Sequence, residues 1–246
     1  MKKYNMIKVV SCFWNAKNYL STYVKSLKIQ TFNDFHVYMI DDLSTDGGYE
    51  FAQELIDGDD RFTLIKNDKK KFKLKNIDEL ISQFYDEDIV VELDADDFLL
   101  GNDVLSFINK TYSDKNIWLT NGSFMYSNGN PGFSQECNPD TIRTDAFRFS
   151  HLRTWKSFLW KNIPKENFLD ENGDYYKSAA DVAYSFPLIE LAGKKHYKFI
   201  DKISYVYNAE SPYNDHKDLS ASGGVSIQNK NADQIRNKPK LKTLNR

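Results

Sequence analysis

The sequence is poor in cysteine and contains no long hydrophobic run. Its 246 residues include two cysteines, Cys12 and Cys137, which allow one disulfide on paper. Cys12 falls in an apolar stretch expected to be a core strand, so two reduced thiols are the favoured interpretation. No apolar run approaches the roughly 18 residues that a membrane span requires, and the N-terminus lacks the apolar region of a signal peptide. These absences predict a cytoplasmic protein with no transmembrane segment.

An excess of positive charge is also missing. The formal net charge is −2, which argues against a dedicated nucleic-acid binder. No Gly-x-Gly-x-x-Gly follows the first predicted strand, which counts against a dinucleotide-dependent dehydrogenase. Hydrophobic residues make up 41% of the chain and aromatic residues 15%, so it can bury a sizeable core.

Strand and helix patterns alternate through the first hundred residues. Apolar stretches predict four buried strands, at residues 7–13, 35–40, 62–65 and 89–91. Apolar residues at helical spacing predict a helix between each pair of strands. This βαβαβαβ order predicts a parallel sheet with right-handed crossovers. Ligands of such sheets bind beyond the carboxyl ends of the strands.

Acidic residues gather at those carboxyl ends. Asp41 and Asp42 end the second strand, and Asp94, Asp96 and Asp97 follow the fourth, in VVELDADDFL. Carboxylates this close together repel one another, which is costly unless a cation or a ligand compensates. Mg²⁺ and Mn²⁺ prefer oxygen ligands and keep positions open for substrate phosphates. The Asp-x-Asp segment therefore predicts an anchor for a metal and a diphosphate, with a solvated acidic turn as the plainer alternative.

The pattern changes after residue 97. The expected elements are a helix containing Leu105, Ile108 and Tyr112, a strand at 117–126, a long loop at 127–141, a helix containing Leu152, Trp155 and Leu159, a helix at 179–191, and a strand at 203–207. From about residue 220 the apolar periodicity disappears, which predicts a disordered tail at 220–246. The sequence thus predicts a single domain at 1–219, with halves at 1–100 and 101–219.

Three ordered segments of the first half resemble family 2 glycosyltransferases of the GT-A fold. FWNAKNYLSTYVKSLKIQTF resembles the opening strand and helix of that family. IDDLSTDGG resembles its Asp-Asp-Gly-Ser-Thr-Asp-Gly turn, with Leu43 in place of the usual glycine, and ELDADDFL resembles its metal motif. HLRTWK, AADVAYSFPLIELAG and YVYNAESPYNDH match more loosely. The resemblance implies an α/β fold with a Rossmann-like, mostly parallel central sheet flanked by helices, a nucleotide-sugar-binding half at 1–100 and a mixed acceptor-side half at 101–219.

The resemblance also implies a reaction. A sugar would pass with inversion from a nucleotide-diphosphate sugar, with UDP as the default nucleotide, to a hydroxyl of a glycan, protein or lipid-linked acceptor. Mn²⁺ or Mg²⁺ would bridge the diphosphate. Two other functions stay open: a sugar-nucleotidyltransferase, although FWNAKNYL is not the Gly-rich basic signature of that class, and a non-catalytic nucleotide-sugar or glycan-binding module.

Residue roles follow from the same resemblance. Asp41 maps to the contact with the base or ribose, and Asp94 and Asp96 map to the metal motif, with Asp96 as the direct ligand. Inverting members carry a carboxylate near the start of a later helix, often the second residue of a Glu-Asp pair. Asp181 occupies that place after Ala180, and is the candidate base. A sugar hydroxyl is a poor nucleophile, so a carboxylate that accepts its proton during attack assists the reaction.

Other candidates have plainer alternatives. Asp42 caps a turn or contacts the donor, and Lys73 or Lys75 lies in a solvated loop or meets the diphosphate. Arg153 pairs with an acidic neighbour or faces the diphosphate. His216 is a surface histidine or a metal ligand. The four tryptophans are expected in the core rather than as sugar platforms. If Asp181 is only a helix-start acid, the base is expected in the preceding loop, at Glu171 or Asp174.

Overall fold

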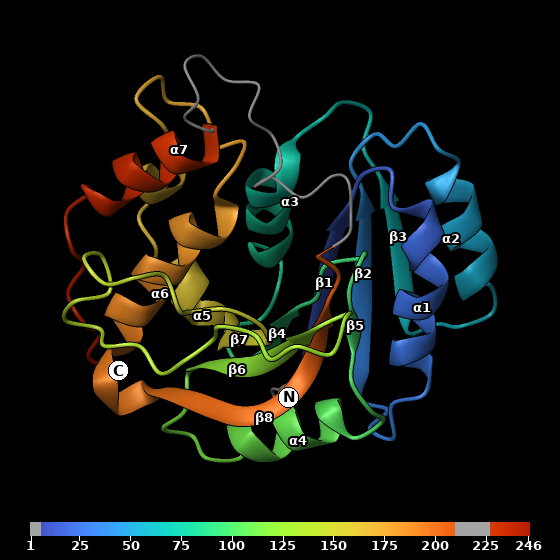
Figure 1. The fold of residues 1–246 in the computed structure, drawn as a ribbon, viewed down its shortest axis with the longest axis horizontal. Coiled ribbons are helices and arrows are strands. Elements are labelled where there is room, and N and C mark those ends of the chain that lie inside the picture. Colours follow the sequence, from blue (N-terminus) through green and yellow to red (C-terminus); the bar gives the residue numbers. More distant parts are fainter. Residues whose placement is uncertain (1–5, 210–226) are drawn as a thin grey trace.

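The computed structural model describes residues 6–209 and 227–246. Within these residues eight strands form one curled, mixed sheet (Figure 1). Its spatial order is β3-β2-β1-β4-β7-β6-β8-β5. The strands are β1 (Ile7–Phe13), β2 (Phe35–Asp41), β3 (Phe62–Lys66), β4 (Ile89–Glu92), β5 (Phe98–Leu99), β6 (Leu119–Tyr126), β7 (Arg153–Lys156) and β8 (Tyr197–Tyr207).

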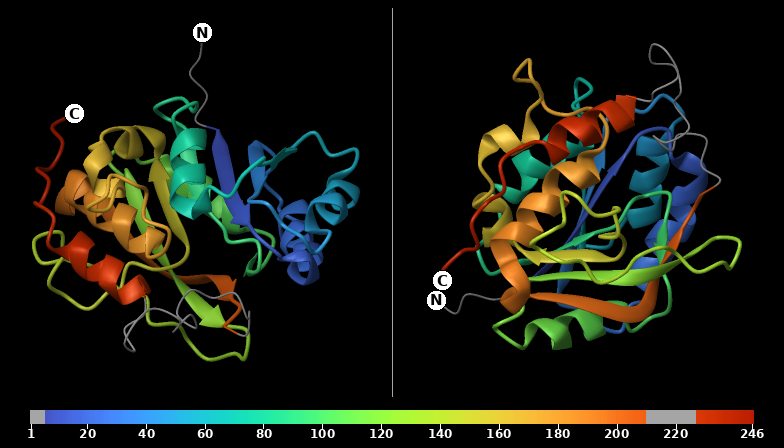
Figure 2. Two further views of the ribbon diagram at one scale, coloured as in Figure 1. Left: turned by 90° about the horizontal axis from the view of Figure 1, so that it is seen from above. Right: turned by 60° about the vertical axis from the view of Figure 1, so that its left-hand side comes forward.

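The first four strands form the predicted parallel half. β1 pairs in parallel with both β2 and β4, and β2 pairs in parallel with β3. The connecting helices are α1 (Lys17–Lys28), α2 (Gly48–Ile56) and α3 (Phe72–Ile81). Figures 1 and 2 show α1 and α2 on one side of these strands and α3 on the other. The predicted α/β fold, with a parallel first half flanked by helices, is confirmed.

Alternate residues of β1 and β4 face two separate cores. Val10 and Val90 belong to the core under α3 and the C-terminal helices, whereas Val9 and Val91 belong to the core under α1 and α2. This period of two follows from the pleat of a strand, and residues that are apolar on both faces are expected where helices cover both sides. The remaining helices are α4 (Val104–Tyr112), α5 (Ser157–Lys161), the 3₁₀ turn η1 (Lys165–Phe168), α6 (Ala180–His196) and α7 (Ile227–Arg236).

The segment around Trp155 differs from its prediction. A helix was expected there, but Arg153–Lys156 forms β7, antiparallel to both β4 and β6, and a helix begins only at Ser157. All four residues of β7 are buried. The apolar spacing fits either element, and pairing with the exposed edge of β4 decides in favour of a strand.

The predicted disordered tail is wrong for residues 227–246. Helix α7 buries Ile235, which is 1% exposed. The last residues then run along α6, where the backbone N–H of Leu244 donates to the carbonyl of Leu191 at 2.9 Å. Hydrogen bonds attach much of this segment to the rest of the structure, so that few apolar side chains are needed for its attachment. The sequence of the segment therefore shows no clear apolar stripe. Residues 210–226 lie outside the described part.

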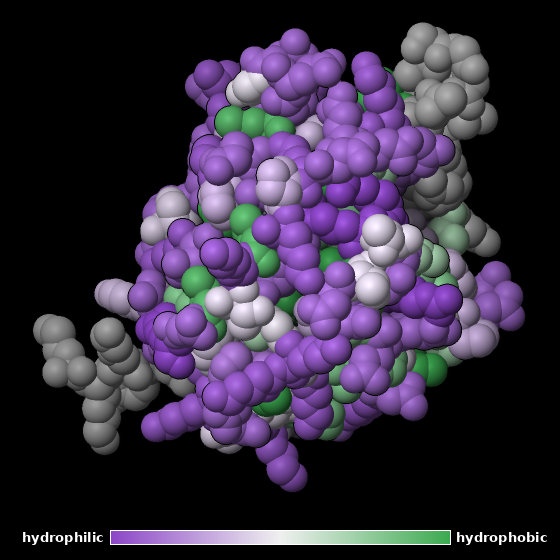
Figure 3. Space-filling model, turned by 90° about the vertical axis from the view of Figure 1, so that its left-hand side faces the viewer, coloured by the Kyte–Doolittle hydropathy of each residue, from purple (hydrophilic) through white to green (hydrophobic). Residues whose placement is uncertain are grey.

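The face that carries α7 and the C-terminal segment is mostly hydrophilic, with small separate apolar patches (Figure 3). Across residues 6–209 and 227–246, no helix has the length and apolar character that crossing a membrane requires.

Candidate active site

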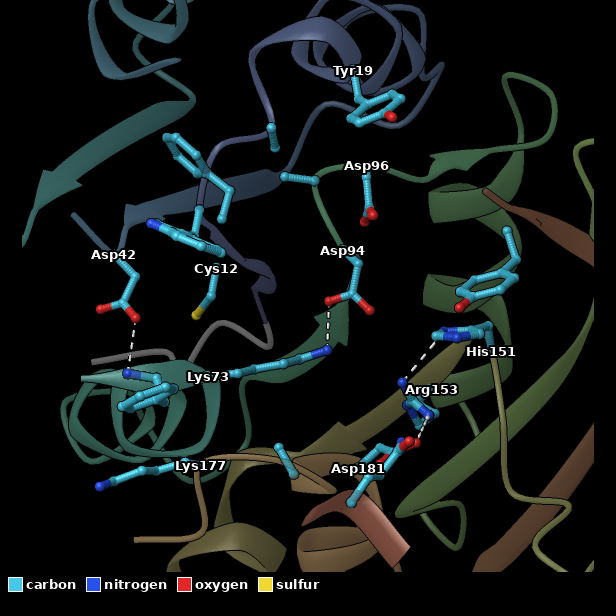
Figure 4. A pocket seen from close by; sticks show the side chains of 18 of the residues that line it. Cys12, Tyr19, Asp42, Lys73, Asp94, Asp96, His151, Arg153, Lys177 and Asp181 are labelled. Carbon is cyan, nitrogen blue, oxygen red and sulfur yellow. Dashed lines mark hydrogen bonds and ion pairs between the residues drawn. The ribbon is translucent and has the colours of Figure 1, made fainter. Parts of the chain in front are cut away.

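A cavity of about 310 Å³ opens at the carboxyl ends of β1, β2 and β4 (Figure 4). Its walls come from both halves of the chain, with β7 and the start of α6 facing the parallel strands. The polar and charged lining residues are Tyr19, Asp42, Lys70, Lys73, Asp94, Asp96, His151, Arg153, Lys177, Asp181, Tyr207 and Gln228. Of the sequence-predicted site residues, the cavity therefore brings together Asp42, Lys73, Asp94, Asp96, Arg153 and Asp181.

Asp42 shapes one wall of this cavity. Its carboxylate accepts hydrogen bonds from the backbone N–H groups of Lys71 and Phe72, at 2.8 and 2.9 Å, and from the side-chain amide of Asn67 at 2.8 Å. Phe72 has a φ of 64°, which is unfavourable for a bulky residue, and these bonds hold it there. Both oxygens of Asp42 thus have protein donors, and the residue positions the start of α3.

Asp41 lies behind the wall. It is fully buried, and its Oδ1 accepts the backbone N–H of Ser44 at 3.1 Å. Its Oδ2 is buried and has no hydrogen-bond partner among the described residues. Buried carboxylate oxygens are almost always hydrogen-bonded, so this atom calls for a donor.

The acidic motif places three carboxylates close together. Asp94 and Asp96 line the cavity, and Asp97 lies behind them at 1% exposure. Asp97 accepts hydrogen bonds from the hydroxyl of Tyr205 and from the backbone N–H of Asn208. Burial raises the pKa of Asp97 well above its ordinary value, and the charges of Asp96 and Asp94 raise it further. Crowding of these carboxylates therefore disfavours the charged form of Asp97 unless a cation compensates.

The same group of residues fits a divalent cation. One ligand atom each from Asp94, Asp97 and His151 lies within 4.8 Å of the others. Burial, and then the charge of Arg153, lower the pKa of His151 well below its ordinary value, so the imidazole is neutral. Carboxylate oxygens with one imidazole suit Mn²⁺, and the oxygens alone suit Mg²⁺. The predicted ligand Asp96 lines the cavity beside this group, and His216 lies outside the described residues.

Glu92 holds two of the cations that line the cavity, Lys73 and Arg153. Its Oε2 lies 2.6 Å from Nε of Arg153, and its Oε1 lies 2.8 Å from Nζ of Lys73. Lys73 also bonds Asp94 at 2.5 Å, and the Tyr184 hydroxyl donates to Glu92. Burial alone would raise the pKa of Glu92, but Arg153 and Lys73 outweigh it and hold that pKa well below its ordinary value.

Glu92→Gln is therefore expected to lower the free energy of unfolding by about 3–5 kcal/mol at pH 7, because it leaves two cations without their buried counter-charge. The folded-state pKa of Glu92 is lowered, so its stabilisation is present above the unfolded pKa of about 4.3 and declines as the pH falls below it. Urea denaturation of both proteins at several pH values tests this.

Glu79→Gln is the matched control, since Glu79 is 45% exposed and pairs with Lys71 at the surface. It should change stability by no more than about 1 kcal/mol. Equal losses in the two variants would show that the Glu92 network contributes nothing particular.

Arg153 connects this network to Asp181. Arg153 is 1% exposed, and its Nη1 lies 3.8 Å from Oδ2 of Asp181. Its Nη2 lies 3.4 Å from Nδ1 of His151. The predicted diphosphate ligand thus lines the cavity between a candidate base and a candidate metal group (Figure 4).

Asp181 lies where two cavities meet. It is the second residue of α6, and its side chain is 30% exposed. A neighbouring cavity of about 840 Å³ shares four lining residues with the first: His151, Asp181, Tyr207 and Gln228. Glu171 and Asp174, the reserve candidates for the base, line neither cavity. A proton acceptor at Asp181 therefore has access to ligands on both sides.

Some lining residues were not anticipated. Trp118, Trp155 and Trp160 are buried as expected, but Trp14 is 42% exposed and lines the first cavity, so the core prediction is wrong for it. Nζ of Lys70 lies 3.4 Å from the centre of the Trp14 ring. Trp14 directly follows β1, and its place at a carboxyl strand end was the available signal.

The structure also changes which lysines are assigned to the cavity. Lys75 pairs with Glu79 at 3.8 Å and does not line the cavity, so of the two alternatives only Lys73 does. Lys177 lines the cavity from the loop before α6, and nothing in its local sequence indicated this.

Comparison with known proteins agrees with this fold. The model of the family described as glycosyl transferase family 2 matches residues 8–158. Among solved structures, S. aureus TarS is similar at 17% identity and a TM-score of 0.65, over 83% of this chain and 37% of that one. TarS 1–349 in complex with UDP-GlcNAc is similar at 16% identity and a TM-score of 0.65, over 84% and 59%.

A mannosyltransferase is also similar. PcManGT from Pyrobaculum calidifontis, in complex with GDP-Man and Mn²⁺, matches at 16% identity and a TM-score of 0.57, over 87% of this chain and 60% of that one. The chain thus spans between 37% and 60% of the length of these structures. No curated protein sequence matches it significantly.

Proposed function

The chain belongs to glycosyl transferase family 2, and from this premise we propose that it transfers a sugar from a nucleotide-diphosphate sugar to an acceptor hydroxyl. The observation that carries the proposal is the position of Asp181. The Asp181 side chain lines both a cavity with clustered cations and carboxylates and a second cavity that is available to another ligand. A donor in the first cavity and an acceptor in the second would meet at this carboxylate.

The donor is proposed to lie along the carboxyl ends of β1, β2 and β4. Asp41 is fully buried behind the wall, and its unpartnered oxygen would accept a hydrogen bond from the base or ribose where donor binding opens the wall in front of it. The Trp14 ring, which now carries the Lys70 ammonium, would stack on the base where that ammonium moves to the diphosphate. Lys70, Lys177 and Arg153 supply positive charge for the diphosphate, as does Lys73 if it turns from Asp94. A UDP-sugar is the proposed donor, supported by the similarity to the UDP-GlcNAc complex of TarS.

Asp94 and Asp96, with Asp97 and His151 beside them, would hold Mn²⁺ or Mg²⁺. Such an ion, when bound, stabilises the negative charge of a departing diphosphate. Lys73 lies 2.5 Å from Asp94 and balances part of the charge of this carboxylate. The ion pair with Glu92 would keep Arg153 aimed at the diphosphate.

The proposed transfer step inverts the anomeric carbon. The acceptor oxygen forms a bond to that carbon from the face opposite the diphosphate, and the bond to the diphosphate breaks, so the bonding pair leaves with the phosphate oxygen. The acceptor proton passes to Asp181. Arg153, at 3.8 Å, orients the Asp181 carboxylate for this task. The sugar passes through a state with oxocarbenium character, as in glycoside hydrolysis.

A donor screen tests the proposed function. Thermal shift with UDP-sugars and GDP-sugars, with and without Mn²⁺, identifies the donor, since a ligand that binds only the native state raises the melting temperature. Nucleotide release is then measured in Mn²⁺ without acceptor. An enzyme hydrolyses the donor slowly under these conditions and a non-catalytic binding module does not, so the measurement separates the two. Failure of every nucleotide sugar to bind would reject the proposal.

Asp41→Asn is expected to raise the donor KM by about 10- to 100-fold, the equivalent of one hydrogen bond to a charged group. The amide keeps the bond from Ser44 and its shape, and kcat should change less because base contacts are alike in ground and transition states. Steady-state kinetics with the donor found in the screen measures both.

Asp34→Asn is the control for this prediction. Asp34 is exposed and lies just before β2, at the end of the strand opposite Asp41. The donor KM of Asp34→Asn should match that of the wild type. An unchanged KM in Asp41→Asn would make Asp41 a turn residue only.

A further inference from the structure

The cavity of about 840 Å³ next to Asp181 is built from a different set of side chains than the donor cavity. It lies between β6, the loop that follows it, the start of α6 and one face of α7. Its lining residues are Phe124, Tyr126, Phe133, Phe147, Ser150, His151, Asp181, Val182, Tyr207, Ala209, Gln228, Asn229, Ala232, Asp233 and Arg236.

Aromatic rings form one wall. Phe124 lies edge to face with Phe133 at 5.5 Å and with Tyr207 at 6.0 Å, and Tyr126 lies edge to face with Tyr207 at 5.9 Å. Phe133 is 48% exposed, which is unusual for so large an apolar side chain. Gly132 allows its loop to pack directly against the Phe124 ring, because a Cβ at this position would come within 2.5 Å of that ring.

Such rings fit the apolar face of a sugar. The C–H groups on one face of a pyranose carry small positive charges and meet the electron-rich face of an aromatic ring. The hydroxyl groups at the edge of the sugar then require polar partners. Gln228 and Asn229 of α7 and Ser150 supply amide and hydroxyl groups on the same lining.

The charges of this cavity disfavour an anionic ligand. Its described lining contains two carboxylates, Asp181 and Asp233, and one guanidinium, Arg236. Nη1 of Arg236 already donates to the carbonyls of Arg143 and Asp145, at 2.6 and 3.0 Å. The donor cavity, in contrast, holds Lys70, Lys73, Lys177 and Arg153. Phosphates therefore find cations in the first cavity, whereas the described lining of the second carries net negative charge.

Helix α7 gives this cavity a character of its own. Gln228, Asn229, Ala232, Asp233 and Arg236 recur at the spacing of one helical face. The helix is anchored because the Arg143 guanidinium donates to the Ile235 carbonyl at 2.7 Å and pairs with Glu190. This wall lies outside residues 8–158, which match the family.

We propose that this cavity binds the acceptor as an uncharged saccharide, with one sugar ring stacked on Phe133 and its hydroxyls on α7. The proposal rests on the proposed function in that the reacting hydroxyl would face Asp181. It excludes phosphate-containing polymers as acceptors.

Saturation-transfer NMR on the full chain tests the proposal without a donor. The neutral probes are cellotriose, maltotriose, chitotriose and mannotriose, and the anionic probes are glycerol 3-phosphate and ribitol 5-phosphate. At least one neutral probe should receive saturation from aromatic protons, and the anionic probes should not. Phe133→Ala should weaken the binding of that probe by at least tenfold. Tyr85→Ala, which removes an aromatic side chain that is 75% exposed and outside both cavities, should leave it unchanged.

Three results would overturn the proposal: binding of an anionic probe in place of the neutral ones, no binding of any neutral probe, or unchanged binding in Phe133→Ala. The donor screen is independent of these outcomes. A saccharide that binds through Phe133 while no nucleotide sugar binds would reject the proposed transferase and retain the saccharide site. Donor binding with no saccharide binding would do the reverse.

Discussion

Asp181→Asn is expected to lower the rate of sugar transfer by about 10²- to 10⁴-fold, the usual effect of removing a general base. The amide keeps the shape of the side chain and its place at the start of α6, but it does not accept the acceptor proton. Donor binding should stay near normal, because none of the proposed contacts to the base, ribose, diphosphate or metal is made by Asp181. Transfer rate is measured at saturating donor, and donor affinity separately by titration.

Asp174→Asn provides the control for this experiment. Asp174 is exposed, lies in the loop before α6 and lines neither cavity. Its transfer rate should equal that of the wild type. Fast transfer by Asp181→Asn would place the base at another residue, and loss of donor binding would show that Asp181 supports the structure of the cavity instead.

Asp96→Asn is expected to remove metal-dependent turnover, with a loss of at least about 10²-fold, since metal stabilisation of a leaving group contributes several kcal/mol. Asp96 is only partly buried, so the fold should survive. A second measurement does not depend on activity: Mn²⁺ should raise the melting temperature of the wild type and have little effect on the variant.

Asp103→Asn serves as the comparison for the metal experiment. Asp103 lies seven positions further along the chain, is 59% exposed and pairs with Lys202. Removing this carboxylate changes the net charge equally and should leave both the Mn²⁺ shift and turnover intact. Full turnover of Asp96→Asn in Mn²⁺ would defeat the assignment of Asp96 as a ligand.

Local patterns were sufficient for the first half of the fold. Apolar stretches at β1, β2, β3 and β4, separated by helical spacing, predicted a parallel sheet, because strand and helix periods are properties of neighbouring residues. The rule that ligands bind at carboxyl strand ends then placed Asp42, Asp94 and Asp96 at one cavity. Both steps need only the order of elements along the chain.

Contacts between distant residues were needed for the rest. Arg153 belongs to a strand because β4 offers it an edge, and it faces Glu92, 61 positions away. The C-terminal residues are ordered because Glu190, Arg143 and backbone groups far along the chain bond them. No local periodicity records such pairings.

The sequence by itself therefore determined the parallel sheet, the acidic motif at its edge and the likeness to a family. Only the tertiary structure decided that Trp14 and Lys177 line the cavity at the carboxyl strand ends, that Asp42 has its oxygens occupied while Asp41 keeps one unpartnered, and that Asp181 lies between two cavities. The physical reason is that a side chain's partners are set by the packing of elements far apart in the chain. The type of a residue and its neighbours in the sequence determine only which partners the side chain is able to bind.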